Sequence, residues 1–305
     1  MKKCLRAGFA ALIVATTAAQ VVCAGTITIP NNSFESPQTV YVSINIDSWQ
    51  KSPKPDWYQE SGGYLWTQLT GIFKNTPTTS ADHIDNCDGN QALWLFAVPE
   101  VGLFQDYDST DWHNLPPNHQ FDATFTPGKS YHLTVGVIGS GGGMAQGATL
   151  DLRLYYGDSA TNHVIVAATT LTNDPSVFSN NTHLVDFRVD TATVKPTDLW
   201  AGRHIGVEFR STVDTNLQGG YWDLDNVRLI EGPVLLNPVY TNGQFTFTLL
   251  GEPNASFQVL STTNPSLAVS NWINTATIQN SNGSTAVTNV VGSSVPAFFR
   301  VRQAP

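Results

Sequence analysis

The stretch of residues 218–230 constrains the fold of this chain more than any other part of the sequence. It precedes a Gly-Pro break at Gly232 and alternates like a β-strand. Strict alternation would split its apolar residues between two faces, with Trp222 and Leu224 on one and Val227 and Leu229 on the other. A bulge at Asp225 and Asn226 restores the register, so that all four face the core. Asp223 and Asp225 then share the outer face of an irregular closing strand.

Alternating segments elsewhere favour an all-β fold. Four of them place apolar residues at every second position, namely residues 131–137, 150–156, 185–189 and 205–209. One buried and one polar face are typical of antiparallel sandwich strands. Charged residues make up only 13% of the chain, beside 24 Gly and 17 Pro, which suits short strands joined by many turns. We therefore expect about eight or nine strands before Gly232.

Four short motifs follow one another along the chain. They are Asn-x-Ser-Phe-Glu at residues 31–35, Asp-Gly-Asn-Gln-Ala-Leu at 88–93, Phe-Thr-Pro-Gly-Lys-Ser-Tyr at 125–131 and Leu-Asp-Asn-Val at 224–227. In this order they resemble the landmarks of secreted galactose-binding-like domains of the carbohydrate-binding-module type, over residues 26–232. The resemblance implies a jelly-roll β-sandwich, frequently with a structural calcium ion, and often sugar or cell-wall binding without catalysis.

The N-terminus has the pattern of an export signal. A basic segment ending at Arg6 precedes an apolar run over residues 8–22, and the small residues up to Ala24 suit signal peptidase. The run is shorter than the ~20 apolar residues of a spanning helix, and the residues before Cys23 fit a lipidation box poorly. We expect a signal helix over residues 1–24 and a secreted protein, extracellular or on the cell surface, with the periplasm as an alternative.

Charge and cysteine content narrow the partners and the stabilising interactions. Loss of Lys2, Lys3 and Arg6 with the signal leaves 12 of the 15 Lys and Arg against 24 Asp and Glu, so the net charge of −9 becomes −12. Such a chain repels nucleic acids and anionic membranes. Cys87 is then the one remaining cysteine, so we expect no intramolecular disulfide and a small buried thiol.

The composition changes after Pro233. The charged residues beyond it are only Glu252, Arg300 and Arg302. Residues 251–301 resemble the small fibronectin-III-like β-sandwich domains at the C-terminus of secreted bacterial proteins, which the resemblance implies to be spacers or attachment modules. We expect residues 25–232 to form the large sandwich and residues 233–305 a second, smaller β domain.

Acids at the two ends of the large sandwich suggest a calcium site. If its first and last strands are neighbours, Glu35 meets Asp225 at the bulge, and backbone carbonyls complete the roughly six to eight oxygen ligands that Ca²⁺ takes. We predict Glu35 and Asp225 as ligands of a structural calcium ion, with Asp223 or Asp88 as weaker candidates. The alternative is a strand end whose acids are solvated.

Aromatic residues on the loops suggest a ligand-binding surface. Those predicted to bind a ligand are Trp49, Trp57, Tyr58, Trp66 and Trp112. The apolar face of a pyranose packs on Trp or Tyr while polar neighbours take its hydroxyl groups. The alternative is that these rings close the ends of the sandwich.

Motifs for catalysis are not found in the sequence. It contains no nucleophile elbow, no His-Glu-x-x-His and no cysteine pairs with zinc spacing. We therefore predict a non-catalytic, monomeric carbohydrate-binding protein whose partner is a cell-wall or extracellular polysaccharide or another glycan. A cell-surface or matrix protein with a structural or adhesive role is one alternative.

A jelly-roll polysaccharide lyase is the other alternative. Polar strand faces offer a base and cations for such an enzyme from His132, Arg153, Tyr155, His204 and Arg210. The acidic net charge of the chain disfavours an acidic polymer as substrate.

Overall fold

The structure is a computed structural model that describes residues 25–304 apart from 114, 118, 128, 160–161, 242–243, 251–254, 282–283 and 291–297. The expected signal helix over residues 1–24 lies outside the described residues. The described chain consists of strands, loops and four short 3₁₀ turns, which are η1 (Glu60–Gly62), η2 (Trp66–Gln68), η3 (Thr215–Leu217) and η4 (Val269–Asn271). Its helical turns are all too short and too polar to cross a membrane. The predicted all-β fold class is confirmed.

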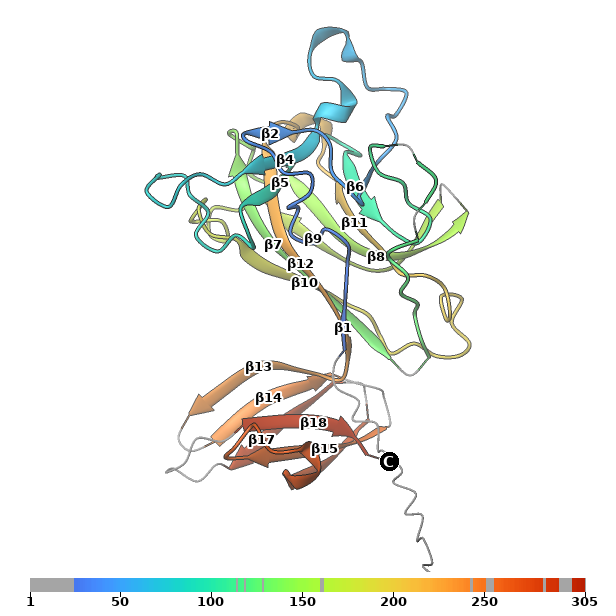
Figure 1. Ribbon diagram of the computed structural model, residues 1–305, viewed down its shortest axis with the longest axis vertical. Helices are drawn as coiled ribbons and strands as arrows, with labels where there is room; N and C mark the ends of the chain where they lie inside the picture. Colours follow the sequence, from blue (N-terminus) through green and yellow to red (C-terminus); the bar gives the residue numbers. More distant parts are fainter. Residues whose placement is uncertain are drawn as a thin grey trace, which may run out of the picture.

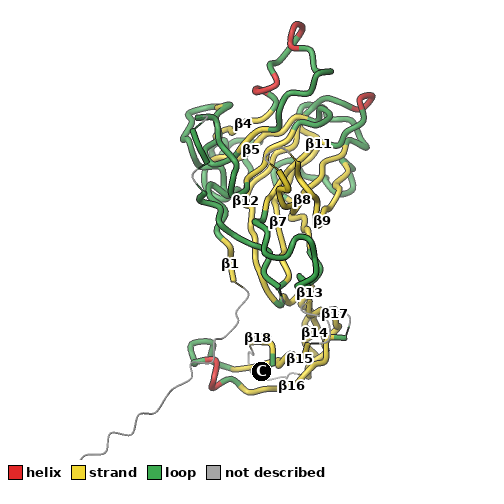
Figure 2. Tube along the Cα trace, turned by 90° about the vertical axis from the view of Figure 1, so that its right-hand side faces the viewer, coloured by secondary structure: helices red, strands yellow, loops and turns green. Residues whose placement is uncertain are grey.

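Two antiparallel sheets form the large sandwich and lie as separate layers in Figures 1 and 2. The first sheet has the order β10-β7-β12-β5-β4-β2, with β1 beside β12. Its strands are β1 (Gly25–Ile27), β2 (Val42–Ser43), β4 (Thr70–Lys74), β5 (Gln91–Phe96), β7 (Ser130–Gly141), β10 (Val185–Asp190) and β12 (Tyr221–Gly232). The second sheet has the order β3-β6-β11-β8-β9. Its strands are β3 (Gln50–Lys51), β6 (Gly102–Gln105), β8 (Thr149–Ser159), β9 (Asn162–Thr172) and β11 (Gly206–Ser211).

Two three-stranded sheets follow β12 in the chain and are drawn in orange and red in Figure 1. One contains β13 (Val234–Thr241), β14 (Gln244–Leu250) and β17 (Ser284–Val290), and the other contains β15 (Ala255–Thr262), β16 (Ile273–Asn280) and β18 (Phe298–Gln303). They enclose an apolar cluster of their own, which includes Phe247, Leu249, Phe257 and Val259.

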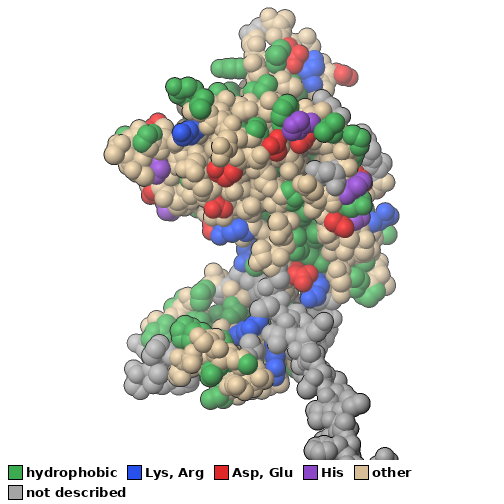
Figure 3. All heavy atoms as spheres, in the orientation of Figure 1, with side chains coloured by type: hydrophobic (Ala, Val, Ile, Leu, Met, Phe, Trp, Pro, Cys, Tyr) green, Lys and Arg blue, Asp and Glu red, His purple; other side chains and the backbone are tan. Residues whose placement is uncertain are grey.

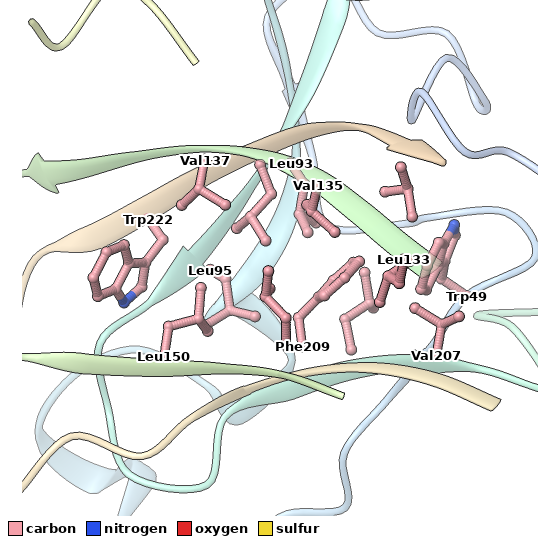
Figure 4. Close-up of a cluster of buried hydrophobic side chains, with 14 of the residues drawn as sticks. Trp49, Leu93, Leu95, Leu133, Val135, Val137, Leu150, Val207, Phe209 and Trp222 are labelled. Atoms are coloured by element: carbon pink, nitrogen blue, oxygen red, sulfur yellow. The ribbon is translucent and has the colours of Figure 1, made fainter. Parts of the chain in front are cut away.

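The main core lies between the two sheets of the large sandwich. Figure 4 shows Leu95, Val137 and Trp222 from the first sheet facing Leu150 and Phe209 from the second. All five side chains are fully buried. Burial of each such side chain stabilises the fold by about 1.5–3 kcal/mol, so the sandwich needs no disulfide to hold its layers together.

The irregular closing strand that the sequence predicts is β12. Its register against β7 shifts between Asp225 and Arg228, and Asn226 at this point has a φ of 55°. The four residues expected to face the core, Trp222, Leu224, Val227 and Leu229, are all buried in it. The predicted bulge at Asp225 and Asn226 is therefore confirmed. Because β12 pairs with β7 on one side and with β1 and β5 on the other, three strands depend on its register.

Substitutions at Asn226 test the bulge. Asn and Gly tolerate a left-handed backbone, whereas a residue such as Ala is disfavoured there by about 1 kcal/mol or more. We expect Asn226→Ala to lower the free energy of unfolding by about 1 kcal/mol and Asn226→Gly to change it by less than about 0.5 kcal/mol, as measured by urea unfolding followed by tryptophan fluorescence. Equal losses in the two variants would contradict a role for the backbone angle.

Candidate functional site

The outer face of the first sheet carries one acid among apolar side chains. Asp223 lies on β12 between two core residues, so it faces away from the core. Its cross-strand neighbours are Trp94 on β5 and Ile138 on β7. Two residues earlier on β12, and therefore on the same face, Tyr221 lies opposite Phe96 of β5. This face therefore surrounds a carboxyl group with aromatic and aliphatic side chains.

Two glycines make room for the aromatic rings. A Cβ on Gly71 of β4 would lie 2.3 Å from the Trp94 indole, and a Cβ on Gly141 of β7 would lie 2.5 Å from the Tyr221 ring. The Trp94 ring therefore lies over β4 and the Tyr221 ring over β7, on opposite sides of Asp223. A larger residue at either glycine would displace a ring.

A row of three rings runs across the sheet next to Asp223. The Phe96 ring centroid lies 6.0 Å from that of Tyr221 and 5.4 Å from that of Tyr64. Tyr64 comes from the loop between β3 and η2. These three residues, which we call the aromatic row, form an apolar wall on one side of the acid.

The charge state of Asp223 follows from its surroundings. Its Oδ1 atom has almost no accessible surface and no hydrogen-bond partner among the described residues. Burial raises the pKa of Asp223 to about 8, because an apolar environment disfavours the charged carboxylate. This shift favours the protonated form of the carboxyl group at neutral pH. A neutral carboxylic acid in an apolar site is able to donate its proton to a bound molecule.

Loops cover the neighbouring part of this face. Ile138 packs with Ile84, Ala92 and Leu184 in a small apolar cluster. Asn86 joins the two covering loops, because its Nδ2 donates to the carbonyl of Leu184 and its Oδ1 accepts from the amide of the same residue. This cover limits the access of water to the side of Asp223 that Ile138 occupies.

Glu35 and Asp225 converge on the loop that leads into β5. Asp225 Oδ2 accepts the backbone N–H of Asp88 at 2.6 Å. Glu35 Oε1 accepts the backbone N–H groups of Asn90 and Gln91, both at 2.7 Å. The structure thus brings an acid from each end of the large sandwich to the same short loop.

This arrangement fits a hard cation. Asp225 is fully buried and its Oδ1 has no partner among the described residues. Burial raises the pKa of Asp225 to about 7, so a nearby cation would favour its ionised form. Gly89, with a φ of 100°, lets Glu35 approach, since a Cβ there would lie 2.5 Å from Glu35 Oε1. Of the other predicted ligands, Asp88 meets Asp225 through its backbone, and Asp223 lies among the aromatic side chains.

Cys87 lies beside this loop as a free thiol. Its Sγ donates to the carbonyl of Gln91 at 3.1 Å. Burial, and then the nearby charge of Asp225, raise the pKa of the Cys87 thiol. It therefore stays protonated at neutral pH, and a protonated thiol is neither a metal ligand nor a nucleophile.

A separate cluster joins Asp47, Asp111 and His113, whose ligand atoms lie within 4.8 Å of one another. Sequence reasoning did not single it out. Asp47 accepts hydrogen bonds from Ser36 Oγ and Trp112 Nε1, and Asp111 Oδ1 lies 2.9 Å from His113 Nδ1. Figure 3 shows acidic and His side chains that lie next to one another on the surface of the large sandwich. These carboxylates already accept hydrogen bonds from other described residues.

Two of the five predicted ligand-binding rings are part of the core. Trp49 and Trp66 are both buried in it. Their indole N–H groups donate to the backbone carbonyls of Asn31 and Ser52 at 3.0 and 2.7 Å. For these two residues the structure agrees with the alternative that the rings close the sandwich.

The other three rings lie on loops. Trp57 and Trp112 are exposed. Trp57 packs edge-on against Tyr58, with an interplanar angle of 78°, and Trp112 packs on His113. Since Trp57 and Tyr58 are nearly perpendicular, they do not form one flat platform.

The residues considered for a lyase are divided between the two sheets. His132 lies on β7 of the first sheet, whereas Arg153, Tyr155 and Arg210 lie on β8 and β11 of the second, and His204 lies just before β11. Glu208 pairs with both Arg153 and Arg210. Arg153 also pairs with Asp151 and Arg210 with Glu100. The two cations are therefore neutralised by acids of their own and do not converge with His132.

His132 has the partners of a catalytic triad without the room for a substrate. Its Nε2 lies 3.1 Å from Ser130 Oγ and its Nδ1 lies 2.6 Å from Asp190 Oδ1. However, Ser130 is 4% and His132 1% exposed, and Ser130 Oγ also donates to the carbonyl of Gly232 at 2.7 Å. The group connects β7 to β10 and to the end of β12, which is a structural role.

Sequence reasoning missed Trp94, Phe96 and Tyr221 as site residues. Alternation does place Trp94 and Phe96 on one face of a strand, and Asp223 on the outer face of another. Only the pairing of β5 with β12 shows that these faces are one surface.

Known proteins resemble the chain over the large sandwich. A family model described as HpiC1-like, HpiC1 cyclase, matches residues 25–230. The structure of a cyclase from Fischerella sp. TAU is 24% identical with a TM-score of 0.50, over 70% of this chain and 99% of that one. The Stig cyclase Fisc from the same source, in complex with (3Z)-3-(1-methyl-2-pyrrolidinylidene)-3H-indole, is 23% identical with a TM-score of 0.47, over 70% of this chain and 100% of that one.

A carbohydrate-binding module is also among the similar structures. The CBM22-1 xylan-binding domain of Xyn10C from Paenibacillus barcinonensis is 10% identical with a TM-score of 0.31, over 63% of this chain and 92% of that one. No curated protein matches the sequence.

The matched family corrects the predicted function. Non-catalytic carbohydrate binding, a polysaccharide partner and the absence of enzymatic activity were wrong predictions, because the family consists of cyclases. The adhesion-protein and lyase alternatives are wrong for the same reason. The four motifs identify a fold, and one fold carries many functions. Since the family model covers residues 25–230, well over half of the 305 residues, the chain belongs to the HpiC1-like cyclase family.

Proposed function

We propose that the chain is a cyclase in which Asp223 donates a proton to a small, apolar, aromatic substrate. The observation that carries this proposal is the Asp223 carboxyl group, whose buried Oδ1 has no partner among the described residues, on a sheet face bordered by aromatic rings. Burial also raises the pKa of this carboxyl group to about 8. The membership in a cyclase family supports it independently.

The proposed reaction is an isomerisation that needs no oxidant or reductant. The Asp223 carboxyl transfers its proton to a double bond of the substrate and becomes a carboxylate. The resulting cation is attacked by a second π bond of the same molecule, which forms the new ring. Loss of a proton from the product cation, back to the Asp223 carboxylate, restores both the neutral product and the acid.

The aromatic side chains suit such a cation. The faces of Trp94, Phe96 and Tyr221 carry negative quadrupole charge, and a cation over a desolvated ring is stabilised by about 2 kcal/mol. Because Asp223 is neutral before the reaction, the site favours a neutral substrate over an anionic or a cationic one. An indole that carries an alkenyl chain is a suitable probe, since the ligand of the Fisc structure contains an indole ring.

Replacement of Asp223 tests the proton donor. Asn has the shape of the acid but no transferable proton, so we expect Asp223→Asn to lower kcat at least ~100-fold while the Kd for the indole probe changes little. Asp108→Asn is the matched control, because the Asp108 side chain is 75% exposed. Full activity in Asp223→Asn would rule out the proposed acid.

Activity should also depend on pH in a defined direction. The acid works only when protonated, and burial raises the pKa of Asp223 to about 8. We therefore expect kcat to be constant around neutral pH and to fall as the pH rises through about 8. A rate that increases over this range would instead indicate a general base.

The stability of the protein supplies a readout that does not require turnover. The pKa of Asp223 rises from 3.8 in the unfolded chain to about 8 in the fold. The protonated Asp223 therefore makes its full contribution to the free energy of unfolding below pH 3.8, and this contribution is lost as the pH rises to about 8. We expect this loss, measured by urea unfolding at fixed calcium concentration, to be smaller in Asp223→Asn than in the wild type.

We also propose that Glu35 and Asp225 hold a structural calcium ion. The buried Oδ1 of Asp225 and the convergence of both acids on residues 88–91 support this site. A bound calcium ion supplies positive charge that neutralises the two carboxylates. Glu35 and Asp225 then fix the entry into β5, the strand that carries Trp94 and Phe96.

Calcium removal tests this site. A ligand that binds only the folded state at 100 times its Kd stabilises it by about 2.7 kcal/mol, so we expect the chelator EGTA to lower the Tm of the wild type. In Glu35→Gln the Tm should be below that of the wild type before EGTA is added and should change little on its addition. Asp82 is an exposed acid, so the control variant Asp82→Asn should respond to EGTA as the wild type does. The same response in all three proteins would contradict the assignment.

We further propose that residues 1–24 direct export and that residues 233–305 form a separate small domain. The apolar cluster enclosed by β13–β18 supports the second point. Mass spectrometry of protein recovered from the medium should find an N-terminus close to Gly25, and intact residues 1–24 would contradict export.

A further inference from the structure

The loop between β3 and η2 reaches the aromatic row at one residue. Figure 1 shows this loop in light blue, projecting from the upper end of the sandwich. Near its end, the Tyr64 ring lies 5.4 Å from the Phe96 ring. Tyr64 is nevertheless 58% exposed. One part of its ring thus continues the apolar wall, and the rest is available to a ligand.

Hydrogen bonds hold this loop in one conformation. Trp66 Nε1 donates to the carbonyl of Ser52 at 2.7 Å, which ties the two ends of the loop together. The Trp66 backbone N–H donates to Glu60 Oε1 at 2.8 Å. The Tyr58 hydroxyl donates to the carbonyl of Tyr64 at 2.9 Å. Tyr64 is therefore presented by a closed, cross-linked loop and not by a free flap.

The base of the loop is also fixed to the sheet that carries the site. Lys51 Nζ donates to the backbone carbonyls of Thr67 and Thr70. Thr70 begins β4, and the next residue, Gly71, lies under the Trp94 ring. The hydrogen bonds of Lys51 thus connect the base of the loop that carries Tyr64 to β4, and the Trp94 ring beside Asp223 lies over β4.

We propose that Tyr64 determines the length of the substrate that the site accepts, an inference that rests on the proposed function of Asp223. A molecule whose reacting double bond lies at Asp223 extends along Tyr221 and Phe96, and its far end meets the Tyr64 ring. A long apolar chain gains this contact, whereas a short chain ends before it. Tyr64 is therefore a specificity-determining residue and takes no part in proton transfer.

The test compares two probes, indoles that carry a short and a long alkenyl chain, with three variants of the full chain. We expect Tyr64→Ala to raise KM for the long-chain indole about tenfold, which is the loss of one aromatic contact, and to leave KM for the short-chain indole unchanged. Tyr64→Phe should keep the length preference, because it keeps the ring. Tyr240→Ala is the matched control, since Tyr240 is also 58% exposed but lies on β13.

The outcomes separate this inference from the proposed function. If the wild type converts the probes and Asp223→Asn does not, the function stands and the KM ratio of Tyr64→Ala decides the inference. An equal change for both probes, or no change for either, overturns the role of Tyr64 and leaves Asp223 as the acid. A wild type that converts neither probe overturns both.

Discussion

Burial of Trp222 and Leu224 is the constraint on which the candidate active site depends. Successive residues of a strand point to opposite faces, so fixing these two in the core obliges Asp223 to face the outer side of the sheet. Because β12 lies between β7 and β5, the acid lies in the interior of the sheet and not at its edge. The core thus stabilises a carboxyl group in apolar surroundings that would be unfavourable on its own.

Asp223 and Asp225 are two residues apart and have different surroundings. Asp225 accepts a backbone N–H and lies near Glu35 at the loop before β5, which suits a cation. Asp223 lies between Trp94 and Ile138, which suits a neutral acid. The bulge after Asp225 interrupts the pairing with β7, which resumes at Arg228. Two carboxyl groups on one strand can therefore differ in role because their environments differ.

The outer face of the sandwich distinguishes this chain from a generic jelly roll. The core residues would serve a binding module equally well, and they determine the fold that such modules share. Gly71 and Gly141 are different, because each leaves space for an aromatic ring over the backbone. The loop that ends at Tyr64 extends the same surface beyond the sheet. The proposed activity thus depends on side chains that the core does not require.

The sequence alone determined the strands, their buried faces and the bulge of β12, because alternation and the burial of apolar residues are local signals. It also indicated that Glu35 and Asp225 belong to neighbouring ends of one domain. Only the tertiary structure decided that Trp94 and Phe96 lie beside Asp223 and Tyr221, because that requires the pairing of β5 with β12 across more than a hundred residues. The same pairing decided the chemistry, since the charge of a carboxyl group depends on the neighbours that surround it in space.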